Sequence, residues 1–236
     1  MKKTIASMAL LAALALAGAA NAQIFINAGF MNKNASVRTT RVSNDSTYDD
    51  FRNIGKGYYI GMGYNYVVWK DFGVALGVGY NYTEHNESYS ETYGSVKYDY
   101  TAWLNTKDLN IPLLITYNRE LFPEFFVSGY FGPVFQLGLS AGGERTRVSG
   151  NDPEVTPLDY YAKDDEGVSK WTKYDLGFMV GTGVQYYGAR FDIGYNFGIL
   201  ERSGEGIKDG KYESILMGQF FVGIGYGFDP FIKKRR

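Results

Sequence analysis

Two neighbouring segments of the chain alternate between apolar residues and small or polar residues with a period of two. From Gly57 to Trp69 the even positions carry Tyr, Ile, Met and Val, whereas the odd positions include three Gly and an Asn. The segment from Phe72 to Thr83 repeats the pattern, with Gly, Ala, Asn and Thr on its second face. Side chains alternate between the faces of a strand, whereas a helix would scatter them around its circumference. The pattern predicts two β-strands long enough to cross a bilayer, which takes ~9–11 tilted residues.

Six further segments follow the same alternation less strictly and bring the expected number of strands to eight. They are residues 24–31, 109–117, 125–140, 174–187, 190–200 and 213–228. The alternation is blurred at Leu113-Leu114 and at Phe220-Phe221, so the register of those two strands is less firmly predicted.

The connections between these strands alternate between long and short. The long ones are 32–56, 84–106, 141–173 and 201–212, and the short ones are 70–71, 118–124 and 188–189. Outer-membrane barrels have this asymmetry because their periplasmic turns are short and their outer loops are long. Lipid also tolerates no open sheet edge. We therefore expect an all-β, eight-stranded antiparallel up-and-down transmembrane barrel in the cell outer membrane, with both termini in the periplasm.

Composition separates this reading from a soluble β-sandwich and excludes several classes of protein. The exposed face of a sandwich would be rich in charge, whereas the second face here is small, and Gly makes up 30 of the 236 residues. The formal net charge of −1 disfavours a nucleic-acid partner. The absence of Cys excludes disulfides and thiolate metal sites.

The N-terminus has the three parts of a secretory leader. Lys2 and Lys3 precede an apolar stretch from Met8 to Ala17, and Ala20-Asn21-Ala22 provides a small-x-small cleavage site. The apolar stretch falls short of the ~20 residues of a spanning helix, which disfavours an anchor. We expect a cleavable signal peptide at 1–22 and a single barrel domain at 23–236, ending in a basic tail at 229–236.

Four segments of the chain are informative in their order: LNIPLLITYN at 109–118, FFVSGYFGPVFQLGLSAGG at 125–143, KYDLGFMVGTGVQYYG at 173–188 and FDIGYNFGI at 191–199. The order resembles the outer-membrane protein β-barrel domain family of Gram-negative bacteria, described as porin-like or PorT-like. The resemblance implies an eight-stranded outer-membrane barrel and provides no catalytic residue to transfer. The chain departs from many such barrels by continuing past Phe228 into its basic tail.

The interior of an eight-stranded barrel is just filled by side chains, so we do not expect a diffusion pore. By strand parity, the lumen receives a polar network that includes four charged residues: Asp108, Asp175, Arg190 and Asp192. Because sealed charges need partners, Arg190 is expected to pair with Asp175, Asp192 or Asp108. We expect this network to be a structural plug, and a proton or ion path is the alternative.

The segment 86–106 keeps a β-like composition around a predicted turn at Tyr93-Gly94-Ser95, so we expect a hairpin extending above the membrane. This hairpin and the next outer loop carry a group of aromatic residues, which we expect to form a rim: Tyr89, Tyr93, Tyr98, Tyr100, Trp103, Tyr160, Tyr161 and Trp171. Such rings anchor a protein at a membrane interface or contact a partner protein.

His85 is the only histidine, and nearby Thr83, Glu84, Glu87 and Ser88 would suit a lipid-modifying enzyme. Such a site must face lipid, whereas strand parity places His85 on the lumen or rim side. We therefore expect no catalytic residue, no metal and no cofactor.

The sequence thus predicts a small, non-enzymatic outer-membrane barrel that acts as a structural or interaction platform. Alternatives are a component of a secretion or surface-assembly complex and a surface adhesin that uses its outer loops. The expected partners are outer-membrane lipid and lipopolysaccharide, the barrel-insertion machinery, and a protein bound at the outer loops or the basic tail.

Overall fold

The computed structural model describes residues 22–41, 46–93, 96–149, 152–163, 165, 169–203 and 211–228. The predicted signal peptide, apart from Ala22, and the basic tail lie outside these residues. The described part forms nine strands: β1 (Ala22–Arg41), β2 (Ser46–Trp69), β3 (Phe72–Tyr93), β4 (Val96–Phe122), β5 (Phe125–Ser149), β6 (Asp152–Asp159), β7 (Tyr174–Tyr186), β8 (Ala189–Gly198) and β9 (Lys211–Phe228). Within these residues there is no helix with the length and hydrophobicity of a membrane span.

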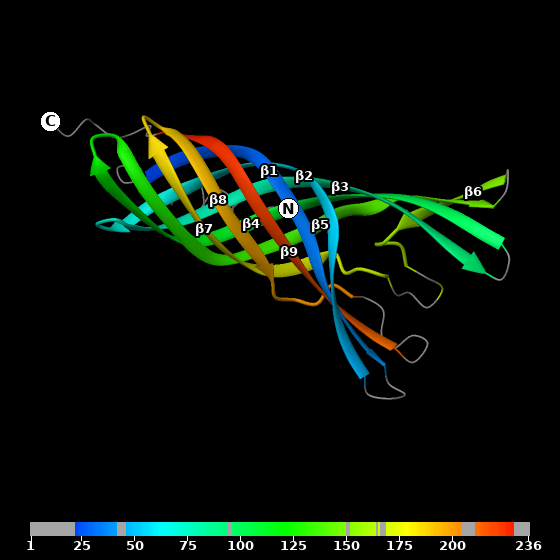
Figure 1. The fold of residues 1–236 in the computed structure, drawn as a ribbon. Coiled ribbons are helices and arrows are strands. Elements are labelled where there is room, and N and C mark those ends of the chain that lie inside the picture. The colour runs from blue at the N-terminus through cyan, green and yellow to red at the C-terminus, as the bar shows by residue number, and fades with distance from the viewer. Residues whose placement is uncertain are drawn as a thin grey trace, which may run out of the picture.

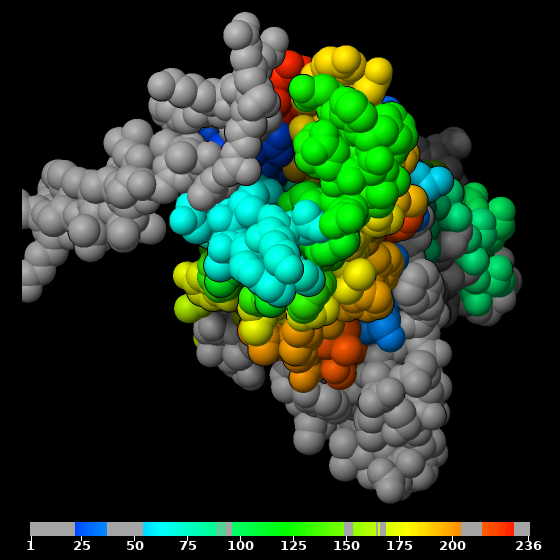
Figure 2. Space-filling view, turned by 90° about the vertical axis from the view of Figure 1, so that its left-hand side faces the viewer, coloured from blue at the N-terminus to red at the C-terminus, as the bar shows by residue number. Residues whose placement is uncertain are grey.

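Eight of the strands close into a ring (Figure 1). Each pairs antiparallel with its neighbours in the order β1, β2, β3, β4, β5, β7, β8 and β9, and β9 pairs back onto β1. The predicted eight-stranded up-and-down barrel is therefore confirmed. The short turns after β2, β4 and β7 lie together at one end, called here the turn end, where Figure 2 shows their side chains packed.

The ninth strand, β6, lies outside the ring and pairs only with the far end of β5, from Gly142–Asp159 to Ser149–Asp152. The residues of β6 fell within the predicted loop 141–173. The strand contains Pro153 and Pro157. Proline is tolerated on an edge strand and supplies no N–H to a further strand, so β6 ends this sheet instead of inviting another chain.

The outer surface of the ring is an apolar band bounded by two belts of aromatic rings. Around the turn end, neighbouring rings contact one another, with centroids 6.1 Å apart for Trp69–Phe72, 5.0 Å for Phe72–Tyr117 and 4.4 Å for Phe122–Phe125. About ten residues further along the strands lie the pairs Tyr58–Tyr82, Phe135–Tyr174 and Tyr195–Phe197. The surface between the belts is largely aliphatic and exposed, and includes Ile60, Met62, Leu76, Val78, Ile115, Val180, Ile193 and Ile224.

Beyond the band the barrel divides into two projecting sheets (Figure 1). The β2–β3 ladder stops at Lys56–Glu84, after which β3 stays with β4, β5 and β6, and β2 stays with β1 and β9. We call the first group, residues 85–93, 96–107, 138–149 and 152–159, the outer sheet. The predicted hairpin is confirmed, because β3 continues to Tyr93, which pairs with Val96; residues 94–95 lie outside the described part.

The predicted loop 32–56 is wrong, since most of it belongs to β1 and β2, which pair as far as Arg41–Ser46. Likewise, most of loop 84–106, much of loop 141–173 and the end of loop 201–212 are strand. Above the apolar band the outward-facing residues of the strands are mostly polar. The period-two signal therefore disappears although the backbone ladder continues.

Inside the ring, large aromatic side chains lie over glycines of the neighbouring strand. An added Cβ would strike Tyr59 at Gly29 and Gly223, Phe25 at Gly63, Tyr130 at Gly181 and Phe221 at Gly194. Tyr59 is paired with Gly29, and Gly29 is paired in turn with Gly223. The glycine-rich faces thus make room for a few rings in a narrow lumen.

We expect Gly223→Ala to destabilise the barrel by about 1–3 kcal/mol, because overpacking a filled interior forces backbone and side chains to shift. The new Cβ would lie 2.0 Å from the Tyr59 hydroxyl and 2.6 Å from the backbone oxygen of Ala28. Urea unfolding of the protein folded into lipid vesicles measures the effect. Gly129→Ala is the matched control, since a Cβ there meets nothing within 4 Å; equal losses in both variants would contradict the packing argument.

Candidate functional site in the barrel lumen

Four charged side chains meet in the lumen at the loop end of the band. Lys33, Asp108, Asp175 and Arg202 are each at most 1% exposed. Lys33 Nζ lies 2.5 Å from Asp108 Oδ2, and Arg202 Nη1 lies 3.8 Å from Asp108 Oδ1. Two cations and two carboxylates therefore lie buried together in the lumen. We call this group the charged quartet.

Hydroxyl groups complete part of the quartet's hydrogen bonding. Lys33 also donates to Thr106, whose hydroxyl lies 2.7 Å from that of Thr83. Arg202 donates to the Tyr161 hydroxyl at 2.6 Å and to the Thr172 carbonyl. Burial raises the pKa of Tyr161 to about 12, so this phenol stays neutral at physiological pH.

Asp108 and Asp175 were predicted to face the lumen, whereas the two cations of the quartet were not. Lys33 and Arg202 fell in the predicted loops 32–56 and 201–212, where no strand parity could be assigned to them. The sequence nonetheless indicated that cations were missing, because the predicted lumen held three carboxylates, Asp108, Asp175 and Asp192, and a single cation, Arg190. Buried carboxylates in such excess require further cations.

Arg190 pairs with Asp192, one of its three expected partners. Its Nε and Nη2 donate to the two carboxylate oxygens at 3.2 and 2.9 Å, and its guanidinium lies 5.1 Å from the centroid of the Phe25 ring. This pair lies nearer the turn end, apart from the quartet that holds Asp108 and Asp175. The predicted single network is therefore two separate clusters.

Trp171 and Tyr161 lie inside the barrel mouth and not on an exposed rim, contrary to the sequence analysis. Trp171 is 6% exposed and packs in one cluster with Ala35, Leu104, Ala141 and Met217. Backbone hydrogen bonds fix the segment, since Trp171 N–H donates to the Tyr160 carbonyl and Thr172 N–H to the Arg202 carbonyl. Residues 160–163, 169–173 and 199–203 thus plug the opening beside the ends of β7 and β8.

The other predicted rim aromatics lie elsewhere. Trp103 is 38% exposed on the outer sheet, where Tyr98 contacts the Arg147 guanidinium and Tyr100 is half-buried. Tyr160 packs against Trp171, with ring centroids 4.3 Å apart. Tyr89 and Tyr93 belong to β3, but their side chains lie outside the described part.

His85 is half-buried on β3, opposite Leu104, beyond the point where β2 leaves β3. Its neighbours have other partners: Thr83 bonds to Thr106, and Glu84 accepts from Tyr82 at 3.2 Å. His85 therefore lies above the apolar band. A non-enzymatic role stays a prediction.

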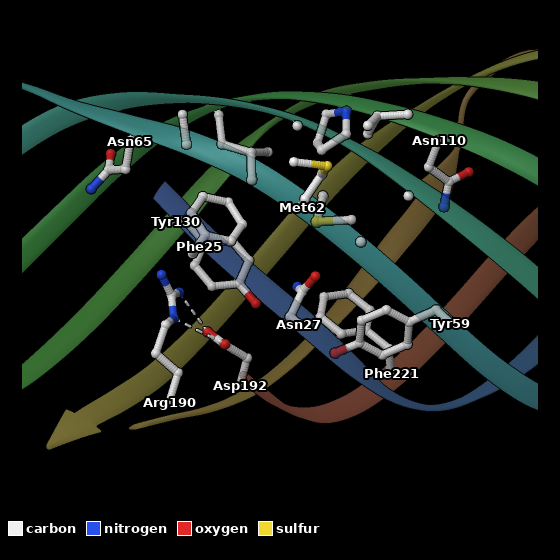
Figure 3. Close-up of a pocket in the computed structure, with 18 of the residues that line it drawn as sticks. Phe25, Asn27, Tyr59, Met62, Asn65, Asn110, Tyr130, Arg190, Asp192 and Phe221 are labelled. Atoms are coloured by element: carbon white, nitrogen blue, oxygen red, sulfur yellow. Dashed lines mark hydrogen bonds and ion pairs between the residues drawn. The ribbon is translucent and has the colours of Figure 1, made fainter. Parts of the chain in front are cut away.

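Below the quartet, amide side chains cross the lumen and form its next layer. Asn81 Nδ2 donates to Gln219 Oε1, and Gln219 Nε2 donates to Gln136 Oε1, each at 3.2 Å. Beneath this amide belt lies a cavity of about 110 Å³ (Figure 3). Its wall includes Phe25, Met31, Tyr59, Tyr130, Met179 and Phe221. The lumen was predicted to be filled by side chains, and this cavity shows that the filling is incomplete.

No family model and no curated protein sequence matches the chain. Solved structures similar to it include Ail, the attachment invasion locus protein of Yersinia pestis, at 14% identity over 88% of this chain and 99% of that one, with a TM-score of 0.32. The outer membrane protein OprG from Pseudomonas aeruginosa is 14% identical over 88% and 96%, with a TM-score of 0.43. Neisserial surface protein A is 12% identical over 87% and 97%, with a TM-score of 0.35. These likenesses concern the fold alone, and the PorT-like resemblance stays a prediction of the sequence.

Removing one charged member of the quartet should lower the free energy of unfolding more than removing one cation and one carboxylate together. We expect Lys33→Met to lower the free energy of unfolding by about 3–5 kcal/mol, because it leaves a buried carboxylate without its cation. Lys33→Met combined with Asp108→Asn should recover most of that loss, since the buried charges of the quartet again sum to zero. Urea unfolding in lipid vesicles compares the two variants, and a double variant as unstable as the single one would contradict a charge-balanced quartet.

Proposed function

We propose that this chain is an integral outer-membrane barrel whose turn end faces the periplasm and whose outer sheet lies at the cell surface. The exposed apolar band between two aromatic belts supports this placement, because aromatic girdles flank the lipid-facing band of outer-membrane barrels. The predicted secretory leader and the closed ring agree with it, since a sheet in lipid cannot keep an open edge.

We further propose that the barrel is a surface interaction platform and not a diffusion pore or an enzyme. The observation that carries this proposal is the outer sheet, in which β3, β4 and β5 continue past the aromatic belt and β6 joins them in a projecting layer. A membrane anchor alone would need only the ~9–11 residues per strand that cross the bilayer. The further strand length is explained if its surface binds another molecule.

The surface of the outer sheet suits a protein partner. Trp103 is exposed, Tyr98 and Tyr100 are partly exposed, and the ion pairs Lys97–Asp99 and Arg147–Glu154 lie on the same layer. Aromatic residues and Arg are enriched in protein interfaces, whereas exposed ion pairs contribute little to the stability of the sheet itself. An adhesin and a component of a surface-assembly complex are two forms of this role.

A shortened barrel tests the platform. Residues 86–103 and residues 144–157 are each replaced by Asn-Gly, a sequence that favours a two-residue hairpin, so that the pairs His85–Leu104 and Gly143–Leu158 close the strands. Because the band, the quartet and the plug are retained, we expect unchanged folding, measured by urea unfolding. In-cell crosslinking and mass spectrometry should then find the partners of the full chain missing from the shortened one.

Trp103→Ala in the full-length chain is the control for a general effect of truncation, and it should reduce the recovery of the same partners without shortening a strand. Identical partners for the full and shortened chains would contradict a platform on the outer sheet. Failure of the shortened chain to fold would contradict the independence of the barrel from its extensions.

The sealed lumen gives a separate prediction. Because the plug, the quartet and the amide belt lie in succession across the lumen, the purified protein should give no steady conductance in planar bilayers. Trp171→Ala removes the largest side chain of the plug and should produce brief openings. A steady ohmic current from the unmodified protein would contradict the proposed plug.

A further inference from the structure

The cavity below the amide belt has features of a binding site that the platform does not use. It extends from Asn81 and Gln219 at the belt to Asn118, whose backbone N–H bonds to Asp71 in the β2–β3 turn. Its lower end therefore reaches the turn end of the barrel, while the quartet and the plug close the lumen on the other side.

The wall of the cavity includes four aromatic rings and three methionine side chains. Phe25, Met31, Tyr59, Tyr130 and Phe221 belong to one packed cluster, and the Tyr59 and Phe221 rings meet edge to face at 5.7 Å. A cavity of about 150 Å³ lined by apolar side chains can bind benzene. The 110 Å³ here is of the size for a single small ring or a similarly compact molecule.

Two polar atoms of the wall have no hydrogen-bond partner among the described residues. The Tyr59 hydroxyl and the Asn110 side-chain oxygen are both buried and unpaired. A hydroxyl can donate and accept, whereas an amide oxygen only accepts. Leaving such groups unpaired costs free energy, which a ligand with a hydroxyl group would recover.

The charges on the wall favour a neutral ligand. Arg190 and Asp192 line the cavity but bond to each other through both carboxylate oxygens, so together they present no net charge. A charged ligand would have to break this pair in a site that holds no other cation or anion among the lining residues.

We propose that this cavity binds a small, neutral, ring-sized amphiphile, of which a monocyclic phenol is the simplest example. The ring occupies the space between Phe25, Tyr59, Tyr130 and Phe221, and the hydroxyl group bonds at Tyr59 or Asn110. The site is reached from the turn end.

The wall of β3 provides a variant that fills the cavity without removing any polar group. Gly79 lines the cavity, and an added Cβ there has no neighbour nearer than 3.5 Å, so Gly79→Leu places a side chain in the ligand space. The matched control is Gly129→Leu on β5, where a Cβ meets nothing within 4 Å and the residue has the opposite parity to luminal Ser128 and Tyr130.

Fluorine NMR of 4-fluorophenol, titrated into the full chain in detergent micelles, tests the site. We expect saturable binding that is lost in Gly79→Leu and kept in Gly129→Leu, with folding of each variant checked by its urea midpoint. Fluorobenzene, which lacks the hydroxyl, should bind at least about five-fold more weakly, and Tyr59→Phe should reduce that difference.

Three results would overturn the proposal: no saturable binding of 4-fluorophenol, equal binding by Gly79→Leu and the unmodified chain, or no preference over fluorobenzene. Equal binding by Gly79→Leu would mean that the phenol binds the micelle and not the cavity. No preference over fluorobenzene would mean that the unpaired polar atoms bond to water and not to the ligand. If Gly79→Leu does not fold, Gly79→Ala provides the smaller filling side chain and should weaken binding by at least about five-fold.

Discussion

The whole structure depends on closing eight strands around a lumen too narrow for ordinary side chains on every inward position. The barrel fits side chains into this narrow lumen by placing a few large aromatic side chains over glycines of the next strand, as Tyr59 lies over Gly29 and Gly223. The high glycine content and the narrow bore therefore belong together, because the inward glycines make the room that the aromatic side chains occupy.

The lumen built in this way has layers of different chemistry. The charged quartet and the plug lie toward the outer sheet, the amide belt crosses the middle, and an aromatic cavity lies toward the turns. Asp108 pairs with Lys33 and Arg202, the amides bond to one another, and the Tyr59 and Phe221 rings meet edge to face. In the cavity wall, the Tyr59 hydroxyl and the Asn110 side-chain oxygen are buried and have no hydrogen-bond partner among the described residues.

The strands that cross the apolar band were predicted correctly from the sequence. Ile60 and Met62 alternate with Gly61 and Gly63 because one face meets an apolar surrounding and the other meets the crowded lumen, and this difference produces a readable period of two. Beyond Lys56 and Glu84 the strict alternation of apolar and small residues is lost although the strands continue, so these strand ends and β6 looked like loops. Lys33 and Arg202 were missed for the same reason, and Trp171 was assigned to a rim because a single aromatic residue in a loop gives no indication of the way it points.

The charged quartet also has a consequence for the order of assembly. Its members come from β1, β4, β7 and the connection before β9, and Lys33 and Asp108 are 75 residues apart in sequence. None of these charges can be neutralised by a neighbour along its own strand, so each stays hydrated until distant strands arrive. Contacts of this kind form late, because the chain entropy of closing long loops must be lost first. The quartet thus stabilises the barrel only once all of the strands that contribute its members are in place.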